Sequence, residues 1–220
     1  SSDLVVYVDD PQDEADSATI GWKVRYFQNI PNDTRLILSY DPGTGSYTTI
    51  NDDVHVLNDL GSYTQWQVDN IVGDNVKVRV QSAAHPDDVF AVSSSAFKVR
   101  GKFRVTAPTA ANVGALAVKV HSADMPAPYL IKWRNCGTLT AAKIEYAPDG
   151  ATWETITEEG SGTSGLAEFS WNPPATSGIL NTIGTTNKIR ISDPGDPLVP
   201  AKVSDAFEIK GQLDLLTPGG

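Results

Sequence analysis

Residues 143–156 read Lys-Ile-Glu-Tyr-Ala-Pro-Asp-Gly-Ala-Thr-Trp-Glu-Thr-Ile, and this stretch decides the fold. Its first four residues alternate between charged and apolar side chains, which is the pattern of a β-strand with one buried face. Asp149-Gly150 then predicts a tight turn, because the Asp carboxylate bonds nearby amides and Gly accepts a positive φ. Trp153 is expected to fold back onto this hairpin. The alternation recurs along the chain and no segment has helical spacing, so we expect an all-β protein.

The hairpin has a counterpart in the first half of the chain, where Tyr40-Asp-Pro-Gly-Thr-Gly-Ser-Tyr47 takes the same place between apolar strands. Further matches lie about 105–111 residues apart, and this drift is what loop insertions and deletions produce. Two copies of one domain explain the matches, and we predict them at residues 1–101 and 102–211. The matching pairs are Trp22 and Trp133, Tyr40 and Tyr146, Trp66 and Trp171, Arg79 and Arg190, and Phe97 and Phe207.

A shorter element recurs three times, as two alternating apolar residues followed by Pro three positions later. It is found at Val6-Tyr-Val8, at Phe103-Arg-Val105 and at Leu213-Asp-Leu215. The second and third examples directly follow the Phe-x-(Val/Ile)-x-Gly ending of a copy. We interpret the element as the opening strand of each domain. Residues 212–220 are then the start of a following repeat or an exchangeable strand, and the chain is expected to belong to a longer array.

Both copies resemble the Ig-like repeat of large bacterial secreted and cell-surface proteins. That family's pattern runs Ile-x-Trp, Tyr-Ser-x-Asp-Gly-Gly-x-Thr-Trp, Ile-Arg-Val and Ser-x-x-Phe-x-Ile. The first copy departs from it at the hairpin and at Gln67-Val68-Asp69, where Val-Pro is usual. The resemblance implies two tandem Ig-like, fibronectin-III-like antiparallel β-sandwiches over nearly the whole chain, and it brings no shared catalytic residue. The second copy matches at Ile131, Trp133, Ile144, Tyr146, Asp149, Gly150, Thr152, Trp153, Ile156, Phe169, Trp171, Pro173, Ile189, Arg190, Ile191, Ser204, Phe207 and Ile209.

Composition excludes several classes of protein. Among 220 residues, 17 are basic and 27 acidic, and the formal net charge of -10 disfavours a nucleic-acid partner. No apolar run approaches the roughly 20 residues that a membrane-spanning helix needs. A single cysteine, Cys136, excludes an internal disulfide, and we expect it to be a small buried side chain.

The aromatic residues have two interpretations. Trp22, Trp66, Trp133 and Trp171 lie in alternating strands, where a large ring usually belongs to the core. Trp153 and Tyr47, at the hairpins, are expected to be partly exposed. Exposed aromatic rings also stack on sugars, so a carbohydrate-binding surface remains an alternative.

We predict no enzymatic activity and no catalytic residue. A Gly-x-Ser-x-Gly nucleophile elbow is absent from the sequence, and the three histidines, His55, His85 and His121, are too far apart in the chain to form a metal-binding motif. The hairpin at Asp149 is close to the Asp box of sialidases, but a propeller would repeat it about every 40–50 residues rather than once per copy.

Clusters of acidic residues are the remaining candidates for a site. Calcium takes about 6–8 oxygen ligands, and carboxylates at domain junctions commonly supply them. Asp is also an ordinary turn residue, and no EF-hand loop is present. Calcium is therefore the one cofactor considered, with solvated turns as the competing interpretation. The candidate ligands are Asp9, Asp10, Asp13, Glu14, Asp193 and Asp196.

These observations predict a non-catalytic structural, spacer or assembly module of a bacterial extracellular or cell-surface protein, such as a stalk, surface layer or filament. The alternative is an adhesin or a carbohydrate-binding module that accompanies a secreted enzyme. The expected partners are neighbouring repeats of the same chain or other protomers, with a glycan or surface ligand under the alternative.

Overall fold

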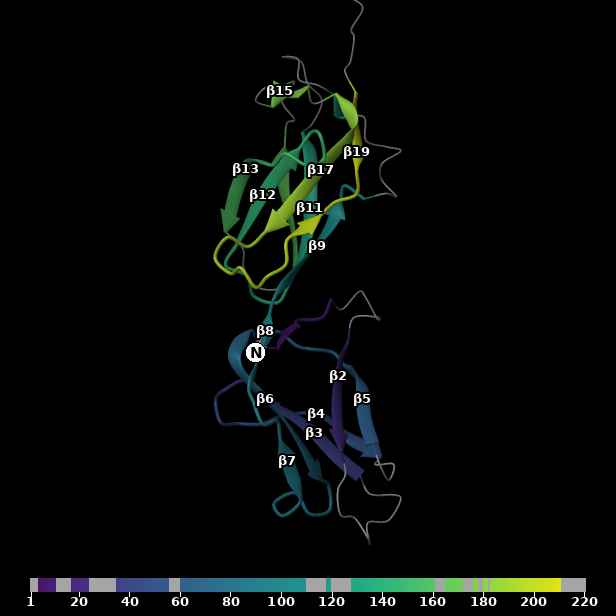
Figure 1. The fold of residues 1–220 in the computed structure, drawn as a ribbon, viewed down its shortest axis with the longest axis vertical. Coiled ribbons are helices and arrows are strands. Elements are labelled where there is room, and N and C mark those ends of the chain that lie inside the picture. Colours follow the sequence, from purple (N-terminus) through teal and green to yellow (C-terminus); the bar gives the residue numbers. More distant parts are fainter. Residues whose placement is uncertain are drawn as a thin grey trace, which may run out of the picture. The chain divides into compact units, whose positions relative to one another are not determined.

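The structure is a computed structural model that describes residues 4–10, 17–23, 35–55, 60–109, 118–119, 128–160, 165–171, 176–177, 180–181 and 183–210. In these ranges the regular elements are β-strands and there is no helix, so the all-β prediction is confirmed (Figure 1). The chain divides into two compact units, Ser1–Gly101 and Lys102–Gly220. The division falls at the boundary that the repeated motifs indicate.

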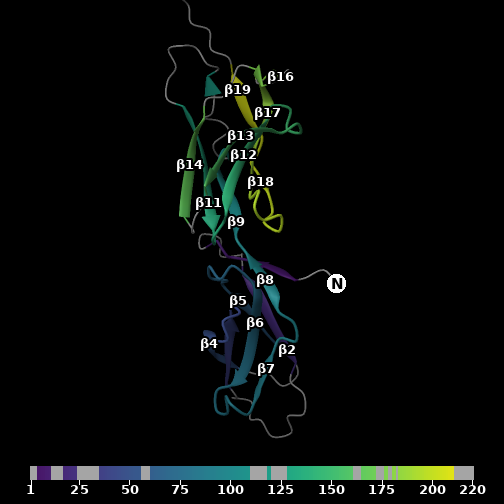
Figure 2. The ribbon, with the colours of Figure 1, turned by 90° about the vertical axis from the view of Figure 1, so that its left-hand side faces the viewer.

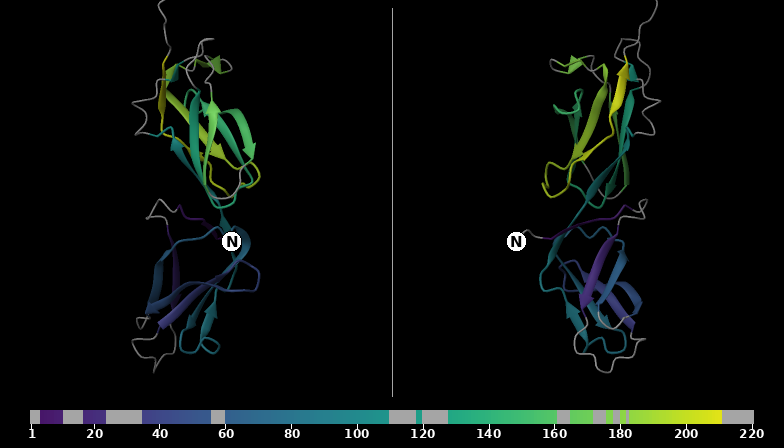
Figure 3. Two further views of the ribbon diagram at one scale, coloured as in Figure 1. Left: turned by 180° about the vertical axis from the view of Figure 1, so that it is seen from behind. Right: turned by 45° about the vertical axis from the view of Figure 1, so that its right-hand side comes forward.

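The first unit contains two sheets. The larger follows the order β1-β8-β6-β3-β4, and β7 pairs with β6 beside that path. The smaller consists of β2 and β5, which Figures 1 and 3 show side by side. The strands are β1 (Val5–Tyr7), β2 (Ala18–Lys23), β3 (Arg35–Asp41), β4 (Thr48–His55), β5 (Leu60–Trp66), β6 (Gly73–Ser82), β7 (Phe90–Val92) and β8 (Phe97–Arg100).

The second unit repeats this plan with one more strand in its smaller sheet and an additional two-stranded hairpin. Its larger sheet runs β10-β19-β17-β12-β13 with β18 paired to β17, and a three-stranded sheet runs β14-β11-β9 (Figure 2). A short hairpin, β15-β16, stands apart from both. The strands are β9 (Lys102–Ala107), β10 (Val118–Lys119), β11 (Tyr129–Cys136), β12 (Ala141–Ala147), β13 (Glu154–Gly160), β14 (Gly165–Trp171), β15 (Thr176–Ser177), β16 (Leu180–Asn181), β17 (Gly184–Ser192), β18 (Lys202–Val203) and β19 (Phe207–Lys210).

The register of the smaller sheets matches between the units. Ala18 faces Trp66 across β2 and β5, just as Tyr129 faces Trp171 across β11 and β14. Trp22 faces Gly61, and its counterpart Trp133 faces Ala167. The sequence matches are therefore matches of place in the fold.

Each unit is centred on an equivalent set of three aromatic rings. In the first unit the ring centroid of Trp66 lies 5.9 Å from that of Tyr40 and 6.3 Å from that of Phe97. In the second unit the corresponding distances are 4.8 Å from Trp171 to Tyr146 and 6.4 Å from Trp171 to Phe207. All six rings are buried, and pairs at such distances stabilise a core beyond the area that they bury. Trp66 and Trp171 are thus core residues, as the alternation predicts.

The core of the second unit draws on both of its sheets. Phe103, Ile131 and Trp133 come from the three-stranded sheet, and Ile144 and Ile189 from the larger one, and all five are almost fully buried. Cys136 is also buried and is a free thiol, as predicted. Alternate residues of each strand supply this core, because successive side chains of a strand point to opposite faces.

The structure corrects the assignment of the first strand. The sequence groups Val6-Tyr-Val8 with Phe103-Arg-Val105, but the two segments pair differently. β1 runs parallel to β8, with Val6 opposite Val99, whereas β9 runs antiparallel to β11. The counterpart of β1 is β10, which runs parallel to β19 with Val118 opposite Ile209. Two alternating apolar residues fit the edge of either sheet, so the pattern alone could not choose between them.

The hairpin at Asp149 is built as predicted. One carboxylate oxygen of Asp149 accepts hydrogen bonds from the amides of Ala151, at 2.9 Å, and Thr152, at 2.7 Å, and Gly150 has a φ of 75°. A hydrogen bond from the Thr152 hydroxyl, together with these two amide bonds, lowers the pKa of Asp149 to about 2. Trp153 is half-buried. The motif acts here as a turn.

In the first unit a different aspartate, Asp41, stabilises the corresponding turn. Asp41, at the end of β3, accepts hydrogen bonds from the amides of Gly43, Thr44 and Gly45 at 2.8, 2.8 and 3.1 Å. Burial alone would raise the pKa of Asp41, but these bonds outweigh it and lower the pKa. The departure of this hairpin from the family pattern therefore changes which aspartate holds the turn.

Candidate functional site

The most distinctive difference between the units lies beside β2. In the second unit β11 is paired on both edges, by β14 and by β9. Among the described strands, β2 is paired on one edge only, by β5. We call the other edge the outer edge of β2. An edge strand presents backbone N–H and C=O groups that are ready to pair with another strand.

Trp22 shows the consequence of this difference. Its counterpart Trp133 is 3% exposed, faces Val105 of β9, and donates from Nε1 to Asn135 Oδ1 at 3.0 Å. Trp22 is only half-buried, and its Nε1 is buried but has no hydrogen-bond partner among the described residues. The prediction that both rings are core residues is therefore confirmed for Trp133. Trp22 is less buried than that prediction requires.

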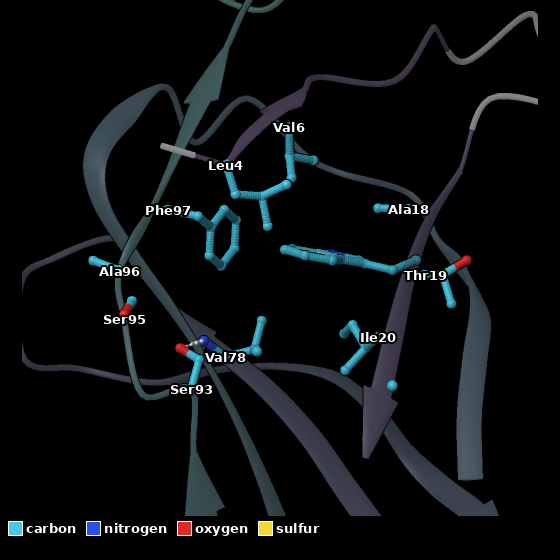
Figure 4. A pocket seen from close by; sticks show the side chains of 12 residues that line it. Leu4, Val6, Ala18, Thr19, Ile20, Val78, Ser93, Ser95, Ala96 and Phe97 are labelled. Carbon is cyan, nitrogen blue, oxygen red and sulfur yellow. Dashed lines mark hydrogen bonds between the residues drawn. The ribbon is translucent and has the colours of Figure 1, made fainter. Parts of the chain in front are cut away.

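An apolar pocket of about 410 Å³ lies at the amino end of β2. Figure 4 shows Leu4 and Val6 of the β1 segment, Ile20 of β2 and Phe97 of β8 around it. Three hydroxyl-bearing residues, Thr19, Ser93 and Ser95, also line it. Ser93 Oγ accepts a hydrogen bond from the amide of Val78 at 3.3 Å, so this hydroxyl is engaged with the backbone. The walls suit an apolar group better than a charged one.

The pocket has a local cause in the sequence. Ala18 lines it, and the second unit has Tyr129 at the matching place. The Tyr129 ring packs against the core of its unit, and burial raises the pKa of its hydroxyl to about 12. Replacing a ring with a methyl group leaves room beside Trp66 that the first unit does not fill from its own described residues.

The candidate calcium ligands do not gather in the described residues. Asp9 and Val68 exchange two hydrogen bonds: the Asp9 carboxylate accepts from the Val68 amide at 2.7 Å, and the Asp9 amide donates to the Val68 carbonyl at 3.1 Å. Asp10 is buried. Asp13 and Glu14 lie outside the described residues. No group of three or more Asp, Glu, His or Cys side chains in the described ranges is placed to hold a metal ion.

Asp193 and Asp196 lie in one loop and hold it together. Asp193 is buried, and its carboxylate accepts from the amide and hydroxyl of Thr140 and from the Gly195 amide at 2.9 Å. Asp196 accepts from the Leu198 amide at 2.9 Å. Asp193 thus links two loops of the second unit through hydrogen bonds.

An arginine lies over an aromatic ring on the larger sheet of each unit. The guanidinium of Arg79 is 5.5 Å from the ring centroid of Tyr47 and 4.3 Å from that of Phe90. The guanidinium of Arg190 is 4.5 Å from the ring centroid of Trp153. Tyr47 is 37% exposed, so the prediction of partly exposed hairpin aromatics is confirmed. The stacked cation covers part of each ring face that a sugar would need.

Comparison with models of protein families and with curated protein sequences finds no match to this chain. In the described parts of the chain, no helix is long and apolar enough to cross a membrane.

Sequence reasoning missed the outer edge of β2 and its pocket. The single available signal is the replacement of Tyr129 by Ala18 at matched positions of the repeat. Reading that signal requires knowing that both residues face a core tryptophan, which the pairing of strands shows.

Proposed function

We propose that each unit is an Ig-like β-sandwich and that the chain is a non-catalytic structural or assembly module of a secreted or cell-surface bacterial protein. The shared strand order, matching register and repeated aromatic core support the first part. The bacterial extracellular setting is supported by the resemblance of the motifs. The units follow each other without a spacer, because β8 ends at Arg100 and β9 begins at Lys102.

The observation that carries the structural role is a parallel strand pair near the ends of each unit. β1 pairs with β8 in the first unit, and β10 with β19 in the second. When a chain is stretched, the early strand is drawn toward the N-terminus and the late strand toward the C-terminus. Because the two strands run parallel, their hydrogen bonds are loaded together instead of opening one after another. Such pairing suits a module that bears tension.

Single-molecule stretching of the full chain tests this role. We expect two unfolding events, one for each unit. Val8→Pro removes the amide that donates to the Arg100 carbonyl at 2.8 Å, whereas Val8→Ala keeps it and serves as the matched control. The proline variant should lower the unfolding force of one event clearly more than the alanine variant, and leave the other event unchanged. Equal effects of the two variants, or a single event of low force in the wild type, would contradict the proposal.

A binding role is the second candidate, and the pocket beside β2 is the observation that favours it. Apolar side chains make up most of its walls, which suits a hydrophobic group, and Thr19, Ser93 and Ser95 are the lining residues with hydroxyl groups that a sugar would need. Titration with oligosaccharides, followed by tryptophan fluorescence because Trp66 lines the pocket, checks the glycan form of this role. A saturable signal that Ala18→Tyr abolishes would establish glycan binding in the pocket.

A further inference from the structure

The strand β9 closes the three-stranded sheet of the second unit. It pairs with β11, and it brings Phe103 and Val105 to the core. Phe103 is 1% exposed, so this strand contributes to the hydrophobic core of the second unit. The first unit has no counterpart of β9 among its described strands, because β1 takes the place of β10. The outer edge of β2 and the half-buried Trp22 lie where such a strand would pass, and it would end beside Gly21, which lines the pocket.

One segment of the chain repeats the pattern of β9, two alternating apolar residues followed by Pro three positions later. Residues 212–218 read Gln-Leu-Asp-Leu-Leu-Thr-Pro, and residues 102–108 read Lys-Phe-Arg-Val-Thr-Ala-Pro. Each segment follows a Phe-x-(Val/Ile)-x-Gly ending, which is the last strand of a unit. β9 directly follows the last strand of the first unit and belongs to the second unit. By the same continuity, residues 212–218 are suited to a unit that follows the second one.

The register of β9 predicts how this segment would meet β2. Val105 faces Trp133 and Arg104 faces Arg134. Carried over at matching positions, Leu215 faces Trp22 and Asp214 faces Lys23. Leu215 would then cover the ring that is left half-buried, and Thr217 and Pro218 would run on past Gly21 and Ile20, which line the pocket.

Charge favours this pairing over a copy of β9 itself. An arginine at the position of Asp214 would face Lys23 directly, and like charges at opposing positions of a sheet are destabilising. Asp214 and Lys23 have opposite charges, and such a pair at opposing positions is stabilising. The side chain of Lys23 is exposed, so it is accessible to an incoming strand.

We propose that residues 212–218 of one chain add to the outer edge of β2 in the first unit of a second copy. The added strand runs antiparallel to β2, with Leu215 over Trp22 and Asp214 beside Lys23. Donor and acceptor lie in different units, so the contact is head-to-tail, and repeated contacts build a filament or close a ring. Main-chain hydrogen bonds supply the affinity, and the alternate apolar side chains supply the specificity. This inference rests on the proposed structural role and names the partner and the surface that the role uses.

Cysteine trapping between two full-length variants tests the register. One variant carries Lys23→Cys and the other Asp214→Cys, and they are mixed under mild oxidation. Opposing residues of paired strands have Cβ atoms roughly 4.5–5.5 Å apart, which is close to the spacing that a disulfide spans. The control replaces Asp214→Cys with Thr217→Cys, which the same register places opposite Gly21, two residues along β2 from Lys23. Diagonal neighbours of this kind lie about 7–8 Å apart, which is beyond the usual span of a disulfide. The native Cys136 is 1% exposed and stays out of the reaction.

The expected result is a covalent dimer that contains one chain of each variant, at least tenfold more abundant than with the Thr217→Cys control. A chain that carries both cysteines should form crosslinked oligomers and not a closed monomer. Two outcomes would overturn the inference: a mixed dimer no more abundant than with the Thr217→Cys control, or an intrachain disulfide in the double variant at low concentration. Each of these leaves the stretching experiment unaffected, so failure here and failure of the structural role can be told apart.

Discussion

Arg190 donates from Nε to Glu145 Oε2 at 2.6 Å, across the pairing of β12 with β17. Glu145 is buried, and Lys143 lies on its other side, with Nζ 2.9 Å from Oε1. The hydrogen bond from Arg190 is the main cause of a lowered pKa at Glu145, and burial offsets part of it. Arg190 thus pairs with an acidic residue directly opposite it on the neighbouring strand.

The stability that Glu145 contributes should depend on pH. Its pKa is lower in the folded state than the usual 4.5, so the contribution is fully present above pH 4.5 and is lost as pH falls through the folded pKa. We expect Glu145→Gln to cost about 1.5–3 kcal/mol of unfolding free energy at pH 7, as charge-assisted hydrogen bonds do. At pH 3 the difference between wild type and variant should shrink, as urea denaturation can show.

The matched control for that experiment is Glu168→Gln. Glu168 pairs with Lys132 at 3.6 Å, and both side chains are exposed, so its loss should cost less than about 1 kcal/mol. The interpretation of Glu145 would fail if its variant lost the same free energy at pH 7 and pH 3.

Trp133 and Trp22 should differ in what they contribute to stability. Trp133→Ala removes a ring that is 3% exposed and should cost about 3–5 kcal/mol. Trp22→Ala should cost less, because part of that ring already contacts water. Denaturant unfolding of the two variants measures the difference. Equal costs at a concentration where the protein is monomeric would contradict the half-buried setting of Trp22.

Gly150 is required by the hairpin for two reasons. Its φ is 75°, and a Cβ there would lie 2.9 Å from the carbonyl oxygen of Thr186. Gly150→Ala should therefore lower the unfolding free energy by about 1–3 kcal/mol. Gly184→Ala is the control, because a Cβ there has no atom within 4 Å. A melting temperature that falls as much for Gly184→Ala as for Gly150→Ala would refute this account of the turn.

The calcium hypothesis stays a prediction with a direct test. A specific site stabilises the native state by mass action, so millimolar calcium should raise the melting temperature and a chelator should reverse the rise. If Asp193 is a ligand, Asp193→Asn abolishes the rise. If Asp193 only links two loops through its hydrogen bonds to Thr140 and Gly195, the variant lowers the melting temperature equally with and without calcium.

The repeat made much of the fold predictable. Trp66 and Trp171 could be assigned to the core because they alternate with polar residues and recur at matched places, and the structure buries both. Asp149 and Gly150 could be assigned to a turn because only a few residue types satisfy that geometry. Asp41 could not, since its carboxylate reaches amides of a longer loop whose path depends on two glycines, Gly43 and Gly45.

The unpaired outer edge of β2 could not be predicted from the sequence, and the reason is physical. Val6-Tyr-Val8 and Phe103-Arg-Val105 bury the same kind of side chain, and a strand this short has too few residues to specify its sheet. The sheet to which this segment belongs is set by its tertiary pairing, which places β1 next to β8. The pocket then follows from Ala18, whose meaning depends on a neighbour, Trp66, that lies far away in the chain.

The mass of this protein in solution is the most direct test of the proposed head-to-tail assembly through β2. We expect the mass of the wild type to rise with concentration in multiples of one chain. Lys23→Glu, which faces Asp214 with a like charge, should hold the protein closer to a monomer, and Lys23→Glu combined with Asp214→Lys should restore the rise. A wild type that stays monomeric at every concentration, or three proteins with the same masses, would contradict the account.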